Sequence, residues 1–209
     1  MTAGSSDPGA RAGKDDAARR IVLASNNAGK LAELQALLAP LGVAVRTQGS
    51  LGIAAADEPH ETFLENALAK ARHAARLSGL PALADDSGFC VAALGGQPGV
   101  VSARWAGPAR DFAAAMARVQ RELGAAVDRR AWFACALCLA WPDGATASFF
   151  ARADGTAIWP PRGGHGFGYD PMFVPVGHTQ SYGEMAPAQK HTISHRARAF
   201  AQFVAACLR

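Results

Sequence analysis

The sequence predicts an α/β fold, on two observations. Within its 209 residues, a polar N-terminal stretch is followed by an apolar run, a polar loop, a helical pattern and a second apolar run. This order is typical of a strand–helix–strand unit with a parallel crossover. Half of the residues are hydrophobic, so the chain can bury a sizeable core in one domain or in two closely joined lobes.

The strand–helix–strand unit occupies residues 20–47. Residues 20–25 (RIVLAS) predict a short strand that ends in the polar loop NNAGK. Leucines at positions 31, 34, 37, 38 and 41 then recur at helical spacing, and Pro40 and Gly42 end that helix. Residues 43–47 (VAVRT) predict the second strand.

The clearest helix runs from about residue 62 to residue 78. Thr62 and Glu65 match a capping box at its start, and Gly79 and Pro81 end it. The predicted apolar face consists of Phe63, Leu64, Ala67, Leu68, Ala71, Ala74 and Ala75, and the polar stripe beside it of Asn66, Lys70 and His73.

Two neighbouring carboxylates follow this helix. Residues 81–84 (PALA) predict a short strand with Asp85 and Asp86 at its carboxyl end, the edge where ligand sites of open α/β sheets lie. Carboxylates there suit Mg²⁺, which takes oxygen ligands together with substrate phosphates. Glu58 is the candidate for a second metal carboxylate, since it precedes the helix that leads back to Asp85. By itself the segment LADDSG also fits a turn exposed to water.

The second half of the chain predicts a loop, a helix, a hairpin and a closing helix. Residues 95–107 read as the loop, and the helix spans about residues 111–123. The apolar run 131–141, the turn PDG and the run 145–153 predict the hairpin. Residues 159–175 are rich in Gly, Pro and aromatic residues, and residues 193–208 close the fold as a helix with Ser194 as the expected N-cap.

Composition argues against several partners and locations. The net charge of +4 is spread along the chain without basic runs interleaved with aromatic residues, which argues against a nucleic-acid partner. The first twenty residues contain no apolar run of the kind a secretory signal needs, so a cytoplasmic protein is expected, with residues 1–19 as a disordered tail before a single domain at 20–209. The run 131–141 is shorter than the about 20 residues of a membrane helix, so no membrane association is expected.

The four cysteines include one C-x-x-C pair, Cys135 and Cys138. Such a pair can be a redox or zinc site. Here it lies inside an apolar strand, where positions three apart face opposite sides, and no second pair stands at zinc spacing. Buried thiols in a reducing compartment are therefore the preferred interpretation.

Three further motifs each allow two interpretations. The loop SNNAGK lacks the Walker A pattern, but it precedes a helix whose N-terminal amides attract phosphate, with Lys30 as an added charge; a plain turn is the alternative. In GGHGFGYDP, Phe167 and Tyr169 can stack on a base, or the loop can fill the core. KHTISHR lacks the Glu of a zinc motif, so His195 and Arg196 are more plausible as donors towards a ligand.

The order of these motifs carries more information than any one of them. SNNAGK, E…ETFLENALAKA with Glu58 as its first glutamate, LADDSG, GGQPGVVSARWAG, FGYDPMF and SHR together resemble, from about residue 20 onward, the inosine triphosphate pyrophosphatase family. The resemblance implies an α/β fold with an elongated mixed central sheet flanked by helices, and two lobes with an active-site cleft between them. It also implies a homodimer that cleaves ITP, dITP and XTP to the monophosphate and pyrophosphate, thereby cleaning the nucleotide pool.

The resemblance also implies roles for particular residues. Asp86 would bind Mg²⁺ with Glu58 and accept a proton from the attacking water, supported by Asp85. His195 and Arg196 would donate to the oxygen at position 6 of the base, which adenine lacks. The residues implied to contact substrate are Ser25, Asn26, Asn27, Ala28, Gly29, Lys30, Lys70 and Lys190 at the phosphates, Ser87, and Phe167, Gly168, Tyr169, Asp170, His195 and Arg196 at the base. A nucleotidyltransferase and a non-catalytic nucleotide-binding regulator remain as alternatives.

Overall fold

A six-stranded sheet forms the centre of the molecule, of which the computed structural model describes residues 20–208. The strands stand in the order β2-β1-β3-β4-β5-β6. Strand β1 (Arg20–Leu23) pairs in parallel with β2 (Ala44–Thr47) and with β3 (Ala82–Val91). The parallel crossover predicted at the start of the chain is therefore confirmed.

The other half of the sheet is antiparallel. Strand β4 (Arg130–Ala140) pairs with β3 on one side and with β5 (Thr146–Ala157) on the other, which confirms the predicted hairpin. The short strand β6 (Phe173–Pro175) closes the sheet against β5. Parallel and antiparallel pairs together make the sheet mixed, as expected.

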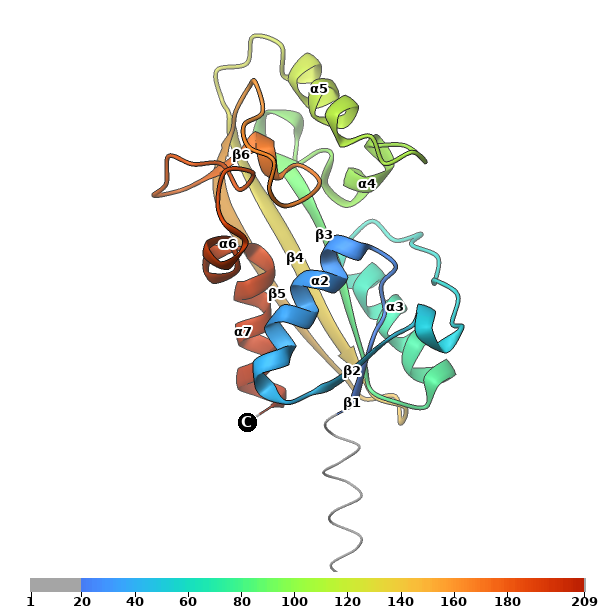
Figure 1. The fold of residues 1–209 in the computed structure, drawn as a ribbon. Helices are drawn as coiled ribbons and strands as arrows, with labels where there is room; N and C mark the ends of the chain where they lie inside the picture. The colour runs from blue at the N-terminus through green and yellow to red at the C-terminus, as the bar shows by residue number, and fades with distance from the viewer. Residues whose placement is uncertain (1–19, 209) are drawn as a thin grey trace, which may run out of the picture.

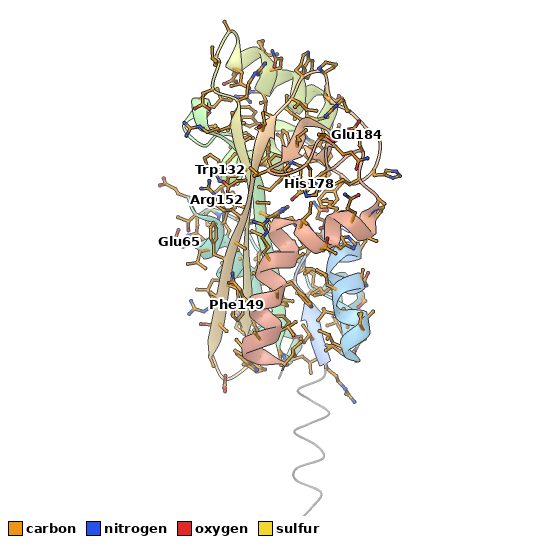
Figure 2. The ribbon with its side chains drawn as sticks, turned by 90° about the vertical axis from the view of Figure 1, so that its left-hand side faces the viewer. Glu65, Trp132, Phe149, Arg152, His178 and Glu184 are labelled. Carbon is orange, nitrogen blue, oxygen red and sulfur yellow. The ribbon has the colours of Figure 1, made fainter. Side chains whose placement is uncertain are left out.

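Helices cover both faces of the lower part of the sheet (Figure 1). Helices α2 (Ala28–Leu38) and α7 (His195–Cys207) pack on one face against the larger apolar side chains of β1, β3 and β4. Figure 2 shows α7 lying along β5 near Phe149, whose ring lies 6.0 Å from that of Phe203. Helix α3 (Phe63–Ser78) packs on the other face, where alanines allow a close approach.

The long strands β3, β4 and β5 extend past β1 and β2 into an upper lobe (Figure 1). There they meet α4 (Ser102–Trp105), α5 (Phe112–Leu123) and β6 around an aromatic core. The cluster includes Phe89, Phe133 and Phe173. The connection 95–107, expected to be a loop, contains α4, and the helix expected from about residue 111 is confirmed as α5 with Asp111 as its N-cap.

The prediction that the strand PALA ends before the carboxylates is wrong. Strand β3 continues to Val91, so Asp85 and Asp86 lie in its middle. The reason is that β4 pairs with β3 along its whole length and supplies backbone hydrogen bonds to the polar segment. Strand β1 ends at Leu23, however, so both carboxylates lie just beyond the end of the parallel pair, where ligand sites are expected.

Helix α3 largely follows the prediction. The Thr62 hydroxyl caps the Glu65 amide at 3.2 Å, which confirms the N-cap. Leu64, expected on the apolar face, is 44% exposed, and Asn66, expected in the polar stripe, is fully buried. The reason is that the Asn66 amide satisfies both backbone groups of His60 and thereby fixes the segment that leads to Glu58.

Several smaller expectations are also resolved. Cys135 and Cys138 pack on opposite faces of the sheet as free thiols, and His191 and His195 lie on two different helices, α6 (Pro187–Ile193) and α7. Ser194 is the N-cap of α7, as expected. Across residues 20–208 no helix is long and apolar enough to span a bilayer. The tail predicted at residues 1–19 lies outside the described residues.

Candidate active site

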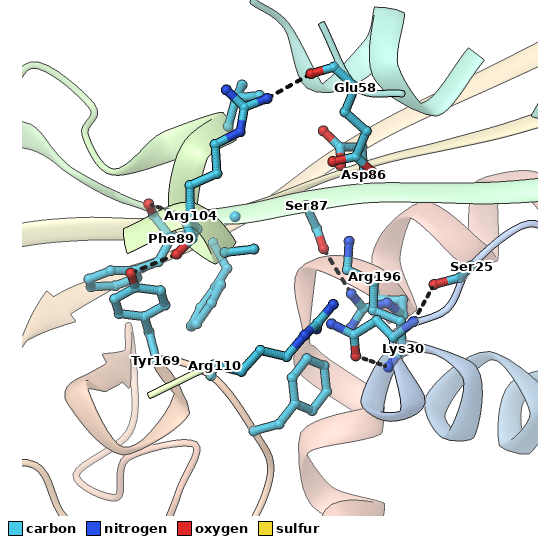
Figure 3. Close-up of a pocket in the computed structure, with 18 of the residues that line it drawn as sticks. Ser25, Lys30, Glu58, Asp86, Ser87, Phe89, Arg104, Arg110, Tyr169 and Arg196 are labelled. Carbon is cyan, nitrogen blue, oxygen red and sulfur yellow. Dashed lines mark hydrogen bonds between the residues drawn. The ribbon is translucent and has the colours of Figure 1, made fainter. Parts of the chain in front are cut away.

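A pocket of about 500 Å³ is lined by residues of both lobes (Figure 3). It brings together most of the residues that the sequence nominated, although they come from β3, from the four helices α2, α3, α6 and α7, from three loops and from the short 3-10 helix that begins at Asp170. Ala28, Gly29 and Asp85 do not line it. The nominated residues in its wall are Ser25, Asn26, Asn27, Lys30, Glu58, Lys70, Asp86, Ser87, Phe167, Gly168, Tyr169, Asp170, Lys190, His195 and Arg196.

The N-terminus of α2 forms one end of the pocket. The Asn27 side chain accepts a hydrogen bond from the Lys30 amide at 3.1 Å, and the Ser25 hydroxyl accepts one from the Asn27 amide at 3.2 Å. The side-chain oxygen Oδ1 of Asn26 accepts a hydrogen bond from the side-chain nitrogen Nε2 of Gln48 at 2.9 Å. These bonds fix the loop, and the positive end of the helix dipole faces a pocket that also contains Lys30.

Asp85 is fully buried and carries the densest set of contacts near the pocket. One of its oxygens lies 2.7 Å from the Lys30 ammonium, and the other accepts from Arg196 Nε at 2.8 Å and from the Cys135 thiol at 3.0 Å. The Ser87 hydroxyl donates to it at 2.8 Å. Burial by itself would raise the pKa of Asp85, but Arg196 and Lys30 outweigh burial and hold that pKa well below its usual value.

Asp86 faces the opposite way, because successive side chains of a strand alternate between its two faces. Its Oδ1 lies 2.9 Å from the Lys70 ammonium, which also contacts Glu58 at 2.6 Å. Its Oδ2 is buried and has no hydrogen-bond partner among the described residues. Burial raises the pKa of the Asp86 carboxyl, and Lys30 and Lys70 offset that rise only in part.

Glu58 and Asp86 fit a Mg²⁺ site. An unpartnered, buried carboxylate oxygen is costly unless something binds it, and Asp86 is one of the residues that line the pocket. In the described part of the chain, no three His, Cys, Asp or Glu side chains converge on one point. Mg²⁺ does not need such a cage, because it commonly takes one or two carboxylates, with waters and substrate phosphates completing its shell.

An ion-pair network forms a second wall of the pocket. The Lys190 ammonium lies 2.6 Å from Asp170 and 2.8 Å from Glu33. Asp170 Oδ2 also accepts from the Phe167 amide at 2.8 Å, so this carboxylate fixes the glycine-rich loop. Burial raises the pKa of Asp170, although Lys190 opposes that rise.

Arg196 links this network to the carboxylates of β3. Its guanidinium donates to Glu33, to Asp85 and, at 2.9 Å, to the Ser87 hydroxyl, while its edge lines the pocket. His195, the preceding residue, stacks on Phe133 with ring centroids 4.9 Å apart. Burial, together with the charges of Arg196 and Lys190, holds the pKa of His195 well below its usual value, so the imidazole is neutral near pH 7.

Phe167 and Tyr169 belong to the same loop but have different surroundings. Tyr169 is buried, stacks on Phe89 at 5.2 Å and donates its hydroxyl hydrogen to the Ser102 carbonyl at 2.9 Å. Phe167 lies against Gly29 at the start of α2, and its ring centroid is 4.8 Å from the Lys190 ammonium. Phe167 is thus the side chain of the loop that is better placed to meet a ligand.

Several residues near the pocket were absent from the sequence prediction. Glu33 follows Lys30 by one helical turn, and a buried glutamate in a leucine-rich helix was the available signal. Cys135 was predicted from the strand pattern to be a buried thiol, and neither that pattern nor the C-x-x-C spacing indicates Asp85 as its partner. Arg104 and Arg110, both shown in Figure 3, were not nominated. Arg104 belongs to the motif GGQPGVVSARWAG, but nothing in the sequence places α4 or the turn at Arg110 beside the pocket.

Comparisons with known proteins agree with this arrangement. The Ham1 family model matches residues 21–206. The dITP/XTP pyrophosphatase of Gluconobacter oxydans (strain 621H) is 56% identical over 189 residues, covering 90% of this chain and 91% of that protein. The dITP/XTP pyrophosphatase of Caulobacter vibrioides (strain ATCC 19089 / CIP 103742 / CB 15) is also 56% identical over 189 residues, covering 90% of this chain and 97% of that protein.

A solved structure extends the match to three dimensions. The HAM1 protein from Coxiella burnetii superposes with a TM-score of 0.81 at 42% identity, over 89% of this chain and 96% of that one. These matches confirm the family predicted from the order of the motifs. The chain belongs to the Ham1 family.

Proposed function

We propose that this chain is a nucleoside triphosphate pyrophosphatase, a hydrolase that converts ITP, dITP and XTP to the nucleoside monophosphate and pyrophosphate and so cleans the nucleotide pool. The relatives named dITP/XTP pyrophosphatase support this activity. The single structural observation behind it is Asp86, a carboxylate with an unpartnered Oδ2 in a pocket that is also lined by the N-terminus of α2, by lysines and by aromatic side chains.

The chain's own residues bind the triphosphate at the cationic end. The first-turn amides of α2 and the Lys30 ammonium supply donors and positive charge to phosphate oxygens. Lys70 lies on the opposite side of Asp86, and it can exchange its contact with Glu58 for a phosphate oxygen, because Glu58 is 44% exposed. The phosphate chain would therefore lie beside Asp86.

Magnesium ion is part of the proposal. Glu58 and Asp86 are the residues that would hold it, for the reasons given above. Bound there, Mg²⁺ would neutralise charge on the phosphates as the leaving pyrophosphate develops negative charge.

Asp86 accepts the proton of the attacking water. The water oxygen forms a bond to the α-phosphorus, the bond between that phosphorus and the α–β bridging oxygen breaks, and pyrophosphate leaves with the electron pair.

The aromatic end selects the base. Phe167 offers a ring face to any purine, and His195 and Arg196 offer N–H donors to the oxygen at position 6 of hypoxanthine or xanthine. Adenine presents an amino donor at that position, so it would leave buried donors unpaired.

Homodimerisation and a cytoplasmic location complete the proposal. Leu64 and Phe150 are large apolar side chains that are 44% and 51% exposed, and both line a hollow between α3 and β5 together with Phe63. Apolar side chains exposed in this way favour association. Sedimentation of the wild type and of Phe150→Glu tests it, with a dimer expected for the first and a monomer for the second.

A product assay tests the activity. Purified protein is incubated with dITP, XTP, ITP, GTP and ATP, with and without MgCl₂, and monophosphate and pyrophosphate are quantified. Equal amounts of the two products, formed from the first three substrates and dependent on Mg²⁺, are expected. Diphosphate with inorganic phosphate would overturn the proposal, a coupled product would indicate a nucleotidyltransferase, and binding without products would indicate a regulator.

A further inference from the structure

Arg110 differs from the other cationic side chains of the pocket. Lys30, Lys70, Lys190 and Arg196 are each paired with one or more carboxylates. Arg104 donates to the Glu58 carbonyl at 2.7 Å. Arg110 lines the same pocket and is exposed, and its side chain makes no hydrogen bond or ion pair with any residue between 20 and 208.

The charges of the pocket show why an unpaired cation matters. The four paired cations face five carboxylates, Asp85, Asp86, Glu58, Glu33 and Asp170, so these clusters hold no surplus positive charge. A nucleoside triphosphate has about four negative charges near pH 7. Mg²⁺ at Glu58 and Asp86 would offset part of this charge. Any further positive charge must come from residues outside these clusters, and Arg110 provides one such charge.

The backbone holds Arg110 in an uncommon conformation. Its φ of +53° is the only positive φ of a non-glycine residue in the described part of the chain. The turn is fixed on both sides, because the Arg110 amide donates to Gly107 at 3.0 Å and the Asp111 amide donates to Ala106 at 2.8 Å. Glycine would adopt this conformation without strain, so an arginine here points to a function for its side chain.

The direction of the side chain suggests which part of a ligand it meets. Figure 3 shows Arg110 extending from the side of Tyr169 across the pocket towards Lys30 and Arg196. It therefore approaches the N-terminus of α2 from the opposite lobe, between the aromatic end and the phosphate end.

We propose that Arg110 binds the phosphate chain of the nucleotide and clamps it against the N-terminus of α2. A guanidinium can donate two parallel hydrogen bonds to phosphate oxygens, and a free one loses no protein partner when it does so. The inference rests on the proposed function, since it concerns the same pocket, and it adds a phosphate ligand from the upper lobe.

Binding of inorganic tripolyphosphate tests the clamp, because this ligand offers a phosphate chain without a nucleobase and binding is measured without turnover. Calorimetric titration with tripolyphosphate in MgCl₂ compares the wild type with Arg110→Gln. The matched control is Arg121→Gln, because Arg121 is an exposed arginine of the same lobe and does not line the pocket. We expect Arg110→Gln to raise Kd about tenfold, or ~1.4 kcal/mol, and the control to match the wild type. Equal Kd values for all three proteins would overturn the proposal.

Two more variants separate binding from folding. Arg110→Gly relaxes the backbone, so its Tm should be no lower than that of the wild type while its Kd rises as in Arg110→Gln. Arg110→Lys keeps the positive charge but loses the two parallel N–H donors of the guanidinium, so it should bind tripolyphosphate more tightly than Arg110→Gln and less tightly than the wild type. A lowered Tm in Arg110→Gly, with affinity lost only in proportion to unfolding, would assign Arg110 to the fold and overturn the proposal.

Turnover then links the clamp to the reaction. With dITP as substrate, Arg110→Gln should raise KM about tenfold and leave kcat nearly unchanged, and the difference should shrink as ionic strength rises. If the wild type hydrolyses no nucleotide, the proposed function fails, whereas the tripolyphosphate titration still decides on Arg110. In another outcome, Arg110→Gln binds tripolyphosphate as the wild type does, while the nucleoside inosine inhibits its turnover less than that of the wild type. That result would show that Arg110 contacts the nucleobase and would overturn the clamp.

Discussion

At the scale of single residues, Asp85 and Asp86 are adjacent in sequence but have opposite environments. The alternation of β3 directs Asp85 into a buried network of Arg196, Lys30, Ser87 and Cys135, and directs Asp86 into the pocket beside Lys70. The pKa of Asp85 is lowered and that of Asp86 is raised. The first carboxylate therefore acts as a fixed counter-charge, and the second remains available for a proton or a metal.

Substituting each carboxylate should separate these roles. Asp86→Asn should lower turnover by at least about 10²–10⁴-fold, since it removes a general base and a metal ligand. It should change the Tm little, because Lys70 retains its ion pair with Glu58.

Asp85→Asn should lower the free energy of unfolding by about 3 kcal/mol or more, because Arg196 and Lys30 stay buried without their counter-charge. Thermal unfolding and pyrophosphate release measure both; identical profiles for the two variants would contradict the division.

Arg196 tests base selection. Most of its N–H groups already donate to Glu33, Asp85 and Ser87, so a purine base can accept a hydrogen bond only from the N–H groups that are still free. Arg196→Ala should lower kcat/KM for ITP about tenfold or more relative to ATP, the effect of losing a charge-assisted hydrogen bond. Both substrates are assayed on both proteins, with circular dichroism confirming that the variant is folded. An equal fold-loss for ITP and ATP would show that Arg196 serves the fold or the phosphates.

At the scale of elements, the N-terminus of α2 and the glycine-rich loop depend on each other. A Cβ added at Gly29 would lie 2.6 Å from the Phe167 ring, so the close packing of these two segments requires glycine. Phe167 lines the pocket and Gly29 does not, although the sequence nominated both. The role of Gly29 is therefore to give the aromatic ring its place.

Gly29→Ala should displace Phe167 and raise KM several-fold. Gly29 is the second residue of α2, outside the helix interior, so any change in Tm reflects mainly the contact of the added Cβ with the Phe167 ring. Gly49→Ala is the matched control, since an added Cβ there meets nothing within 4 Å. Steady-state kinetics and Tm of both variants are compared with the wild type, and unchanged KM in Gly29→Ala would mean that Phe167 does not contact the base.

At the scale of the whole molecule, one carboxylate ties together segments far apart in the chain. Glu33 of α2 contacts Lys190 of α6 and Arg196 of α7, and these cations in turn hold Asp170 and Asp85. Burial by itself would raise the pKa of Glu33, but Arg196 and Lys190 outweigh it and the pKa is lowered. Glu33 is thus a stability determinant whose contribution depends on pH.

Glu33→Gln should reveal that dependence. A lowered folded-state pKa gives stability that is present above the unfolded value of 4.5 and is lost as the pH falls through the folded-state pKa. The variant should therefore be less stable than the wild type by about 3 kcal/mol at pH 7, and the difference should shrink below pH 4.5. Urea unfolding at pH 7 and at acidic pH measures it, and a difference independent of pH would argue against an ionised Glu33.

The sequence by itself determined the family, the α/β class and most of the pocket wall. Helical spacing and capping residues defined α2, α3, α5 and α7, because those signals lie within one or two turns of the chain. The order of six motifs identified Asp86, Glu58, Lys70 and the loop at Phe167 as one site, and the structure places all of them around one pocket.

Only the tertiary structure decided which contacts each of those residues makes and which of them face the pocket. The extent of β3 depends on its pairing with β4, which begins some forty residues later, so the segment LADDSG could not be recognised as mid-strand. Glu33, Cys135 and Arg110 could not be assigned to the site from the sequence for the same reason: their partners, or the pocket they face, belong to other elements. Local patterns record which face of an element is buried, whereas ion pairs and pockets depend on which faces meet once the chain has folded.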